Sequence, residues 1–299
     1  MAGTSRRAPL RIYPFRKIVT DAPVSYSVYS AFSFYGVKRG GELPGPWLVR
    51  ALGELGHATA AIRQTIYRME ATNELQSRVD GRTKHYRLTP AARAEAQAGL
   101  AKIMEEGPER WDGRWTLVHV ASESRGRTER ERLLEIIRAE GFAPMGKGYF
   151  LHPRDRTARL MAAASESGVV DMLDVFRATR VGGEPSQEVA ARYWDLSALS
   201  RQYDRFLVRY RPMLADRRPI EPRAAFVLRF AVVLDFLETA WRDPNLTWEF
   251  LPRDWPGIRA QRAARALYKR LLPTAIAHAD LLIEECGFER TARATRTGY

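Results

Sequence analysis

The sequence predicts an α+β protein, and three observations along its 299 residues lead to that prediction. The N-terminal segment holds three helical patterns followed by a strong hairpin signal. The middle segment alternates short apolar runs with amphipathic helical patterns. The last segment is helical and is interrupted by prolines. We therefore expect three domains, over residues 1–108, 109–185 and 186–299.

The composition is that of a folded protein that lies outside the membrane. Hydrophobic residues make up 45% of the chain and charged residues 28%, which is too apolar for a disordered protein. The most apolar stretch, Ala224 to Leu237, is shorter than the roughly 18 residues of a membrane span and contains Arg229 and Asp235. The single cysteine, Cys286, excludes an intrachain disulfide. Residues 1–16 lack the apolar core of a secretion signal, so we expect a cytoplasmic protein.

The chain is strongly basic. It carries 48 lysines and arginines against 35 acidic residues, for a net charge of +13. Residues 1–110 hold 17 basic and 10 acidic residues, so positive charge is denser there than in the remainder. We expect a polyanionic partner, and we expect the N-terminal segment to contact it.

The N-terminal segment has the order of a winged helix-turn-helix. A polar, alanine-rich helix from Thr89-Pro90 to about Glu106 follows it. The turn Asp80-Gly81 is a strong hairpin signal between two strand-like runs. The predicted helices cover about Val24–Val37, Pro46–Leu55 and Thr59–Thr72, and the hairpin strands cover Leu75–Val79 and Lys84–Leu88.

The third helix has one apolar and one polar face. At about 100° per residue, Ile62, Ile66 and Met69 share the apolar face. The polar face and its flanks hold Ala60, Arg63, Gln64, Tyr67 and Arg68. Such a helix fits the major groove of double-stranded DNA, where Arg63 reads guanine, Gln64 reads adenine and Ala60 allows close approach to a thymine methyl. The alternative is a solvated basic helix with Tyr67 packed against the protein.

The hairpin carries basic side chains that suit phosphates or the adjacent minor groove. They are Arg78, Arg82, Lys84 and His85. The alternative is a wing that contacts only water.

The middle segment predicts a ferredoxin-like α/β sandwich. Its order is strand, helix, strand, helix, strand, with short connections. The strands are expected at Arg114–Val120, Gly148–His152 and Val169–Val175, and the helices at Thr128–Ala139 and Thr157–Ser167. From Ser186 onward the helices are expected to be divided by Pro212, Pro219, Pro222, Pro244, Pro252 and Pro256.

A series of short motifs is distributed along the chain, and it is their order that carries a resemblance. They are Arg39-Gly40-Gly41-Glu42, Ile62-Arg63, Tyr67-Arg68-Met69, Tyr86-Arg87-Leu88-Thr89, Trp111-Asp112-Gly113-Arg114-Trp115, Gly141-Phe142, Trp194-Asp195-Leu196, Phe206 with Arg211-Pro212, Ala225-Phe226, Arg242-Asp243-Pro244, Leu251-Pro252 and Trp255-Pro256-Gly257. From about Val24 to Leu272 the chain resembles the PaaX family of transcriptional repressors, which control the degradation of aromatic acids. The resemblance implies a middle domain like that of a small CRISPR-adaptation nuclease. It also implies release of the operator by phenylacetyl-coenzyme A.

The chain departs from the family pattern at three places. Leu234 and Leu237 stand where the family has a histidine and an arginine, Asn73-Glu74 replaces Gly-Trp, and Leu246-Thr247 replaces Leu-Pro. Because two hydrogen-bonding groups have become aliphatic, we expect phenylacetyl-coenzyme A to bind poorly and a less polar aromatic compound to be the inducer. The alternative is that both leucines are core residues and the effector binds elsewhere.

Motifs of catalysis are missing from the sequence. The five histidines lack metal spacing, and neither a glycine-rich phosphate loop nor a Gly-x-Ser-x-Gly elbow occurs. We expect neither catalytic residues nor a cofactor or metal. The enzyme alternative is a metal-dependent nuclease built on paired carboxylates, for which Glu123 and Asp171 are surface candidates. A pair of histidines, His119 and His152, lies on neighbouring predicted strands; they either meet at a metal or are hydrogen-bonded structural residues.

An aromatic effector needs apolar walls and a few polar groups. The candidates are Trp111, Arg114, Trp194, Arg229, Leu234, Trp241 and Arg242. The alternative for them is core packing, or salt bridges to residues such as Asp243. We therefore expect a homodimeric, ligand-responsive repressor that binds a pseudo-palindromic operator. A nuclease and an effector-independent DNA-binding protein are the alternatives.

Overall fold

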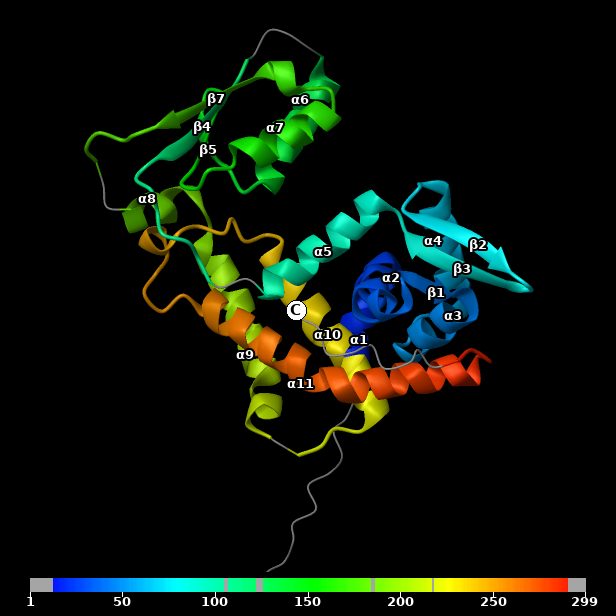
Figure 1. Cartoon of the computed structure of the whole chain (residues 1–299). Coiled ribbons are helices and arrows are strands. Elements are labelled where there is room, and N and C mark those ends of the chain that lie inside the picture. Colours follow the sequence, from blue (N-terminus) through cyan, green and yellow to red (C-terminus); the bar gives the residue numbers. More distant parts are fainter. Residues whose placement is uncertain (1–12, 105–106, 122–125, 184–185, 217, 290–299) are drawn as a thin grey trace, which may run out of the picture. The chain divides into compact units, whose positions relative to one another are not determined.

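A computed structural model describes residues 13–104, 107–121, 126–183, 186–216 and 218–289 (Figure 1). Helices and two antiparallel sheets make this an α+β protein. The chain forms two compact units. Unit 1 is built from described residues within 1–105, 206–237 and 260–299, and unit 2 from those within 106–205 and 238–259. Helices after residue 186 contribute to both units, and the division into three domains stays a prediction.

Unit 1 begins with helices and a small sheet close to the predicted bounds. The elements are α1 (Tyr13–Asp21), α2 (Val24–Ala31), a π-helical turn (Phe32–Gly36), a 3₁₀ turn (Val37–Arg39), β1 (Glu42–Pro44), α3 (Gly45–Glu54), α4 (Thr59–Ala71), β2 (Leu75–Asp80), β3 (Thr83–Leu88) and α5 (Pro90–Met104). The sheet has the order β1-β3-β2. Asp80 pairs with Thr83, so the hairpin turns at two residues, and Gly81 has the positive φ of 58° that such a turn needs. The sequence did not predict α1 or β1.

The core of unit 1 joins the N-terminal helices to helices from the end of the chain. These are the C-terminal part of α9 (Leu196–Ala215), most of α10 (Pro222–Ala240) and most of α11 (Pro256–Glu285). The buried Trp47 of α3 donates its indole hydrogen to the carbonyl of Ala279 in α11, at 3.0 Å. Tyr35 stacks on Phe226 of α10 with ring centroids 5.4 Å apart. Figure 1 shows α11 running beside α3.

Unit 2 contains a four-stranded sheet covered on one face by two helices (Figure 1). Its elements are β4 (Trp115–Val120), α6 (Arg127–Ala139), β5 (Ala143–Gly146), β6 (Tyr149–His152), α7 (Thr157–Glu166) and β7 (Leu173–Ala178). This βαββαβ order, with the sheet order β5-β6-β4-β7, is that of a ferredoxin-like domain. Two short elements, α8 (Ser186–Tyr193) and a 3₁₀ turn (Trp248–Phe250), belong to the same unit.

Two details of unit 2 differ from the prediction. The third strand was expected at Val169–Val175, but a 3₁₀ turn occupies Val170–Met172 and β7 follows it. The prediction was wrong there because Val169 and Met172 are buried in the core, which gives the turn the apolar pattern of a strand. β5 was not predicted, since it is short, contains Pro144 and Gly146 and is irregular at that point.

The expected helical character of the last segment is confirmed, with one correction. Pro212 does not divide two helices but lies inside α9. It lies in the last turn of α9, so the helix continues for only a few residues beyond it. None of the helices in the described part of the chain combines the length and the apolar character that a membrane span requires.

Candidate nucleic-acid interface

Helix α4 is held in place by its buried face. Ile62, Thr65, Ile66 and Met69 are buried, as the helical periodicity predicts. The turn before the helix is fixed by the buried His57, whose Nε2 lies 2.9 Å from the hydroxyl of Ser27 in α2. Burial lowers the pKa of His57, so this ring stays neutral.

The end of α4 explains one departure from the family pattern. Asn73 has a left-handed φ of 58°, a conformation that glycine, and after it asparagine, adopts most readily. Its N–H bonds to the carbonyl of Glu70 at 3.1 Å, and the N–H of Glu74 bonds to that of Met69 at 2.8 Å. These two bonds form a Schellman cap, so Asn73 fills the position of the family's glycine.

The predicted polar face of α4 is exposed. Ala60, Arg63, Gln64, Tyr67 and Arg68 are all solvent-accessible. Tyr67 is 74% exposed, so the alternative that it packs against the protein is wrong. Within the described residues, the side chains of Arg63, Gln64 and Arg68 make no hydrogen bond or ion pair that would have to break before they met a ligand.

The basic side chains of the hairpin are exposed, but several are already paired. Arg78 contacts Glu42 at 2.9 Å and Asp80 at 3.0 Å, and these carboxylates raise its pKa. Lys84 contacts Glu70 of α4 at 2.8 Å. Arg82, at the turn, has no such partner in the described part of the chain. Of the predicted wing residues, Arg82 is therefore the one whose full charge faces solvent.

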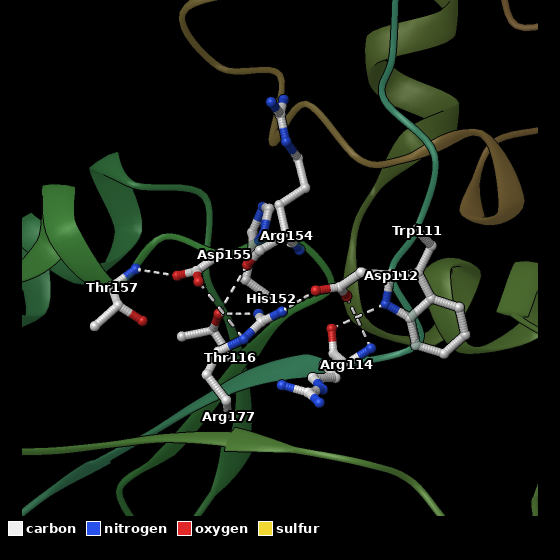
Figure 2. Close-up of polar contacts among 9 residues, drawn as sticks. All are labelled: Trp111, Asp112, Arg114, Thr116, His152, Arg154, Asp155, Thr157 and Arg177. Carbon is white, nitrogen blue, oxygen red and sulfur yellow. Dashed lines mark hydrogen bonds and ion pairs between the residues drawn. The ribbon is translucent and has the colours of Figure 1, made fainter.

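A polar cluster at one end of the unit 2 sheet contains the start of β4 (Figure 2). The guanidinium of Arg177 donates to Asp112 at 2.5 Å and to the hydroxyl of Thr116 at 2.8 Å. Its Nε lies 3.7 Å from Asp155. Asp155 accepts from the backbone N–H of Thr157, which is the main reason why its pKa is lowered. Sequence reasoning did not select Arg177, because it lies beyond the strand expected at Val169–Val175 and its partner Asp112 is 65 residues away in the chain.

The described residues contain no metal site of the kind that the nuclease alternative requires. Both carboxylates of the polar cluster are engaged by Arg177, and no group of three or more potential metal ligands occurs in the described ranges. Asp171 lies on the surface in the turn before β7. Glu123 lies outside the described residues.

The two strand histidines do not meet. In the register of β4 and β6, His152 pairs with Thr116 and His119 pairs with Tyr149. Because side chains alternate along a strand, the two rings point to opposite faces of the sheet. The Nε2 of His152 lies 2.9 Å from the carbonyl of Pro244, and its Nδ1 accepts from the N–H of Arg154 at 3.0 Å. His152 is thus a structural residue with both nitrogens used.

The effector candidates fall in both units. Trp111 and Arg114 lie side by side, because the indole N–H of Trp111 donates to the carbonyl of Arg114 at 2.9 Å (Figure 2). Trp194 donates to the carbonyl of Gly141 at 2.9 Å. The remaining two candidates of unit 2, Trp241 and Arg242, are exposed.

Two effector candidates belong to α10 in unit 1. Leu234 and Arg229 are both buried. For Leu234 this agrees with the core alternative. Arg229 is an unusual core residue, because its guanidinium lies against three aromatic rings.

Three family models match the chain in order. The model for a PaaX-like protein matches residues 25–92, that for the PaaX protein central Cas2-like domain matches 108–190, and that for the PaaX-like protein C-terminal domain matches 194–281. The chain is 25% identical over 248 residues to "Transcriptional repressor PaaX" of Escherichia coli (strain K12), covering 80% of this chain and 77% of that protein. Among solved structures, "Uncharacterized protein Rv0674 from Mycobacterium tuberculosis" matches with 24% identity and a TM-score of 0.49, over 77% of this chain and 90% of that one.

Proposed function

Because this chain belongs to the PaaX family, whose three models follow one another along most of its length, we propose that it is a transcriptional repressor. It binds operator DNA and is released by a small-molecule effector. The relative from Escherichia coli is named a transcriptional repressor, which supports this proposal.

The N-terminal part of unit 1 acts as a winged helix in this proposal. The order α2-α3-α4 followed by the β2-β3 hairpin supports it. In such a domain the third helix enters the major groove and the hairpin reaches the flanking backbone. Here α4 is the recognition helix and the β2-β3 hairpin is the wing.

The observation that carries the proposal is the polar face of α4. It presents Arg63 and Gln64, two side chains with bidentate geometry, without a protein partner among the described residues. Arginine reads the O6 and N7 of guanine, and glutamine reads the N6 and N7 of adenine. Tyr67, Arg68 and Arg82 flank this face and contact phosphates. Arg78 and Lys84 also contact phosphates when their ion pairs with carboxylates of the protein break.

The operator is pseudo-palindromic and is bound by a homodimer in the cytoplasm. Each recognition helix reads one half-site, so the spacing of the half-sites follows the two-fold symmetry. The effector binds better to a conformation in which this spacing is lost, and it lowers operator affinity by that difference in binding free energy.

The effector is a small aromatic compound or an acyl-coenzyme A. Leu234 and Leu237 replace two polar residues of the family pattern, so phenylacetyl-coenzyme A is expected to bind poorly. Trp111, Arg114, Trp194, Trp241 and Arg242 remain candidates for its contacts in unit 2, and Arg229 remains a candidate in unit 1. Calorimetry with phenylacetyl-coenzyme A tests this: tight binding together with operator release would restore the family's effector.

The function is tested by selecting duplexes from a random DNA pool with the full-length protein. We expect one enriched motif with two half-sites, and we expect it to stay intact when Mg²⁺ or Mn²⁺ is added. Enrichment without a shared motif would contradict sequence-specific repression. Cleavage that depends on the metal would support the nuclease alternative.

A further inference from the structure

Arg229 is a buried charged residue in the middle of α10, within a run of apolar residues. It is 1% exposed, and its neighbours on α10, Leu228 and Phe230, are fully buried. Its Nε and Nη1 have no hydrogen-bond partner within the described part of the chain. By contrast Asp235, further along the same helix, is paired with Arg209 at 2.5 Å. Of these two residues, Asp235 is thus neutralised by a partner, whereas Arg229 has no counterion among the described residues.

Aromatic rings surround the guanidinium of Arg229. Its Cζ lies 4.2 Å from the ring centre of Tyr268, 4.4 Å from that of Phe34 and 5.5 Å from that of Tyr35. Cation–π attraction recovers part of the cost of burying the charge. Ring faces accept only weak hydrogen bonds from Nε and Nη1, however, and buried donors of a charged group are expensive to leave without a full acceptor. An added acceptor with negative charge would satisfy both donors and balance the charge of Arg229.

A second unpartnered polar group belongs to the same cluster. The hydroxyl of the buried Tyr35 has no hydrogen-bond partner in the described residues. Burial raises the pKa of Tyr35 to about 12, although the charge of Arg229 opposes this, so the phenol keeps its proton. The nearby Asp280 is paired with Arg39 at 2.8 Å. An incoming anion would thus find a guanidinium and a phenol as donors.

We propose that Arg229 and Tyr35 bind the carboxylate of a small aromatic acid inside unit 1. A carboxylate matches the planar fork of arginine and accepts two hydrogen bonds from it. An aromatic ring attached to that carboxylate is complementary to Phe34 and Tyr268. The apolar surroundings disfavour a polyanion, because in the described part of this cluster Arg229 is the cation that is not already paired with a carboxylate.

The site adjoins the elements that hold the recognition helix, and this regulatory step rests on the proposed function. Phe34 and Tyr35 lie in the π-helical turn that follows α2, and such turns are frequent at functional sites. Tyr35 also makes an edge contact with Trp47 of α3 at 5.7 Å. α3 directly precedes α4, so a ligand on Arg229 shifts the rings against which the helix-turn-helix packs. Binding that favours the shifted arrangement lowers operator affinity.

Calorimetry on the full-length protein tests the site with four probes. Sodium benzoate and sodium phenylacetate carry the carboxylate, while benzamide and phenylacetamide have nearly the same shape without the charge. We expect the acids to bind at least roughly tenfold more tightly than their amides, the effect of one charge-assisted hydrogen bond. Equal binding of acids and amides, or no binding of either acid in the millimolar range, would overturn the proposal.

Three variants identify the residues. Arg229→Met replaces the guanidinium by an apolar chain, and we expect the preference for acids over amides to disappear. Lys269→Met removes a charge from the exposed side of α11 in the same unit, and we expect the preference to persist. Tyr35→Phe removes only the hydroxyl and should weaken acid binding several-fold with little change in Tm. This third variant keeps the buried ring and is therefore expected to fold. If Arg229→Met fails to fold, the affinity of Tyr35→Phe for the acids tests the proposed site.

The regulatory step has a separate readout. We expect the acids to release a selected operator duplex from the wild-type protein and not from the Arg229→Met variant. Release that persists in the variant would place the effector elsewhere. If the wild-type protein selects no operator, the proposed function fails, while the calorimetry still decides whether Arg229 binds carboxylates.

Discussion

His152 illustrates what a buried histidine does when it is not a ligand. It is fully buried in β6, and both ring nitrogens lie within hydrogen-bond distance of backbone groups, at Pro244 and Arg154. Burial lowers its pKa from 6.5 to about 3, with the nearby Arg156 adding to the effect. The folded protein therefore holds this ring neutral at a pH where the unfolded chain protonates it.

This difference predicts a loss of stability in mild acid. Between about pH 6.5 and pH 3, His152 is protonated in the unfolded state and neutral in the folded state. The free energy of unfolding is therefore undiminished by this group above pH 6.5 and falls as the pH drops through that window. The loss is roughly 1.4 kcal/mol per pH unit for this group. Urea unfolding of wild type and His152→Gln at several pH values measures it. Glutamine keeps a donor near Pro244 without titrating, so we expect a shallower pH dependence, and equal slopes would contradict the assignment.

Helix α4 is the element whose role can be tested most directly. We expect Arg63→Ala and Gln64→Ala each to weaken binding to the selected operator by roughly 1 to 3 kcal/mol and to leave binding to a scrambled duplex almost unchanged, because base-edge contacts carry discrimination. Fluorescence anisotropy with both duplexes measures this. Arg138→Ala, on an exposed position of α6 in unit 2, is the matched control. An equal loss on both duplexes would make the two residues phosphate contacts.

The β2-β3 hairpin leads to a different prediction, since the proposed function places its charges against phosphates. Changing Arg82 and Lys84 together to alanine should lower affinity for every duplex and flatten the slope of log affinity against log salt by up to ~0.9 for each phosphate that the variant no longer neutralises. Glu70→Gln should act in the opposite direction, because it frees Lys84 from its ion pair. Salt titrations of both variants check this. An unchanged slope in the double variant would mean that the wing is only solvated.

Local signals explain which elements the sequence could predict. The helices and the hairpin of unit 1 carry periodicity and a turn signal within their own residues. β1 and β5 do not, since each is short and contains a proline, and only pairing with β3 or β6 makes them strands. For the same reason the polar face of α4 was predictable, whereas the neutralisation of Lys84 by Glu70 and of Asp112 by Arg177 was not. Those partners are 14 and 65 residues apart in the chain.

At the scale of the molecule, several family motifs meet inside unit 2. A Cβ on Gly141 would lie 3.0 Å from the backbone of Pro244, and the carbonyl of Gly141 accepts from Trp194. The phenol of Tyr203 donates to Asp243 at 2.8 Å and its ring packs against Trp255. These motifs hold together segments that are distant in the chain. This structural role explains why these residue types occur there, whether or not an effector binds to them.

Unit 1 is discontinuous in the same way, and this predicts how fragments of the chain behave. In residues 1–108 taken alone, Tyr35 and Trp47 are without Phe226 and Ala279, so aromatic surface that is buried in the whole protein meets water. In residues 109–185, by contrast, the apolar core cluster of the sheet and its two helices, from Val118 to Met172, is complete.

We therefore expect the two fragments to differ when they are heated. The middle fragment should unfold in one cooperative transition that circular dichroism can follow. The N-terminal fragment should show none, or a Tm far below that of the intact chain, and should bind a dye for exposed apolar surface. If residues 1–108 instead unfolded cooperatively at the Tm of the whole protein, their helices and hairpin would be independent of α10 and α11. An effector bound at Arg229 would then have no packed route to α4, the proposed recognition helix.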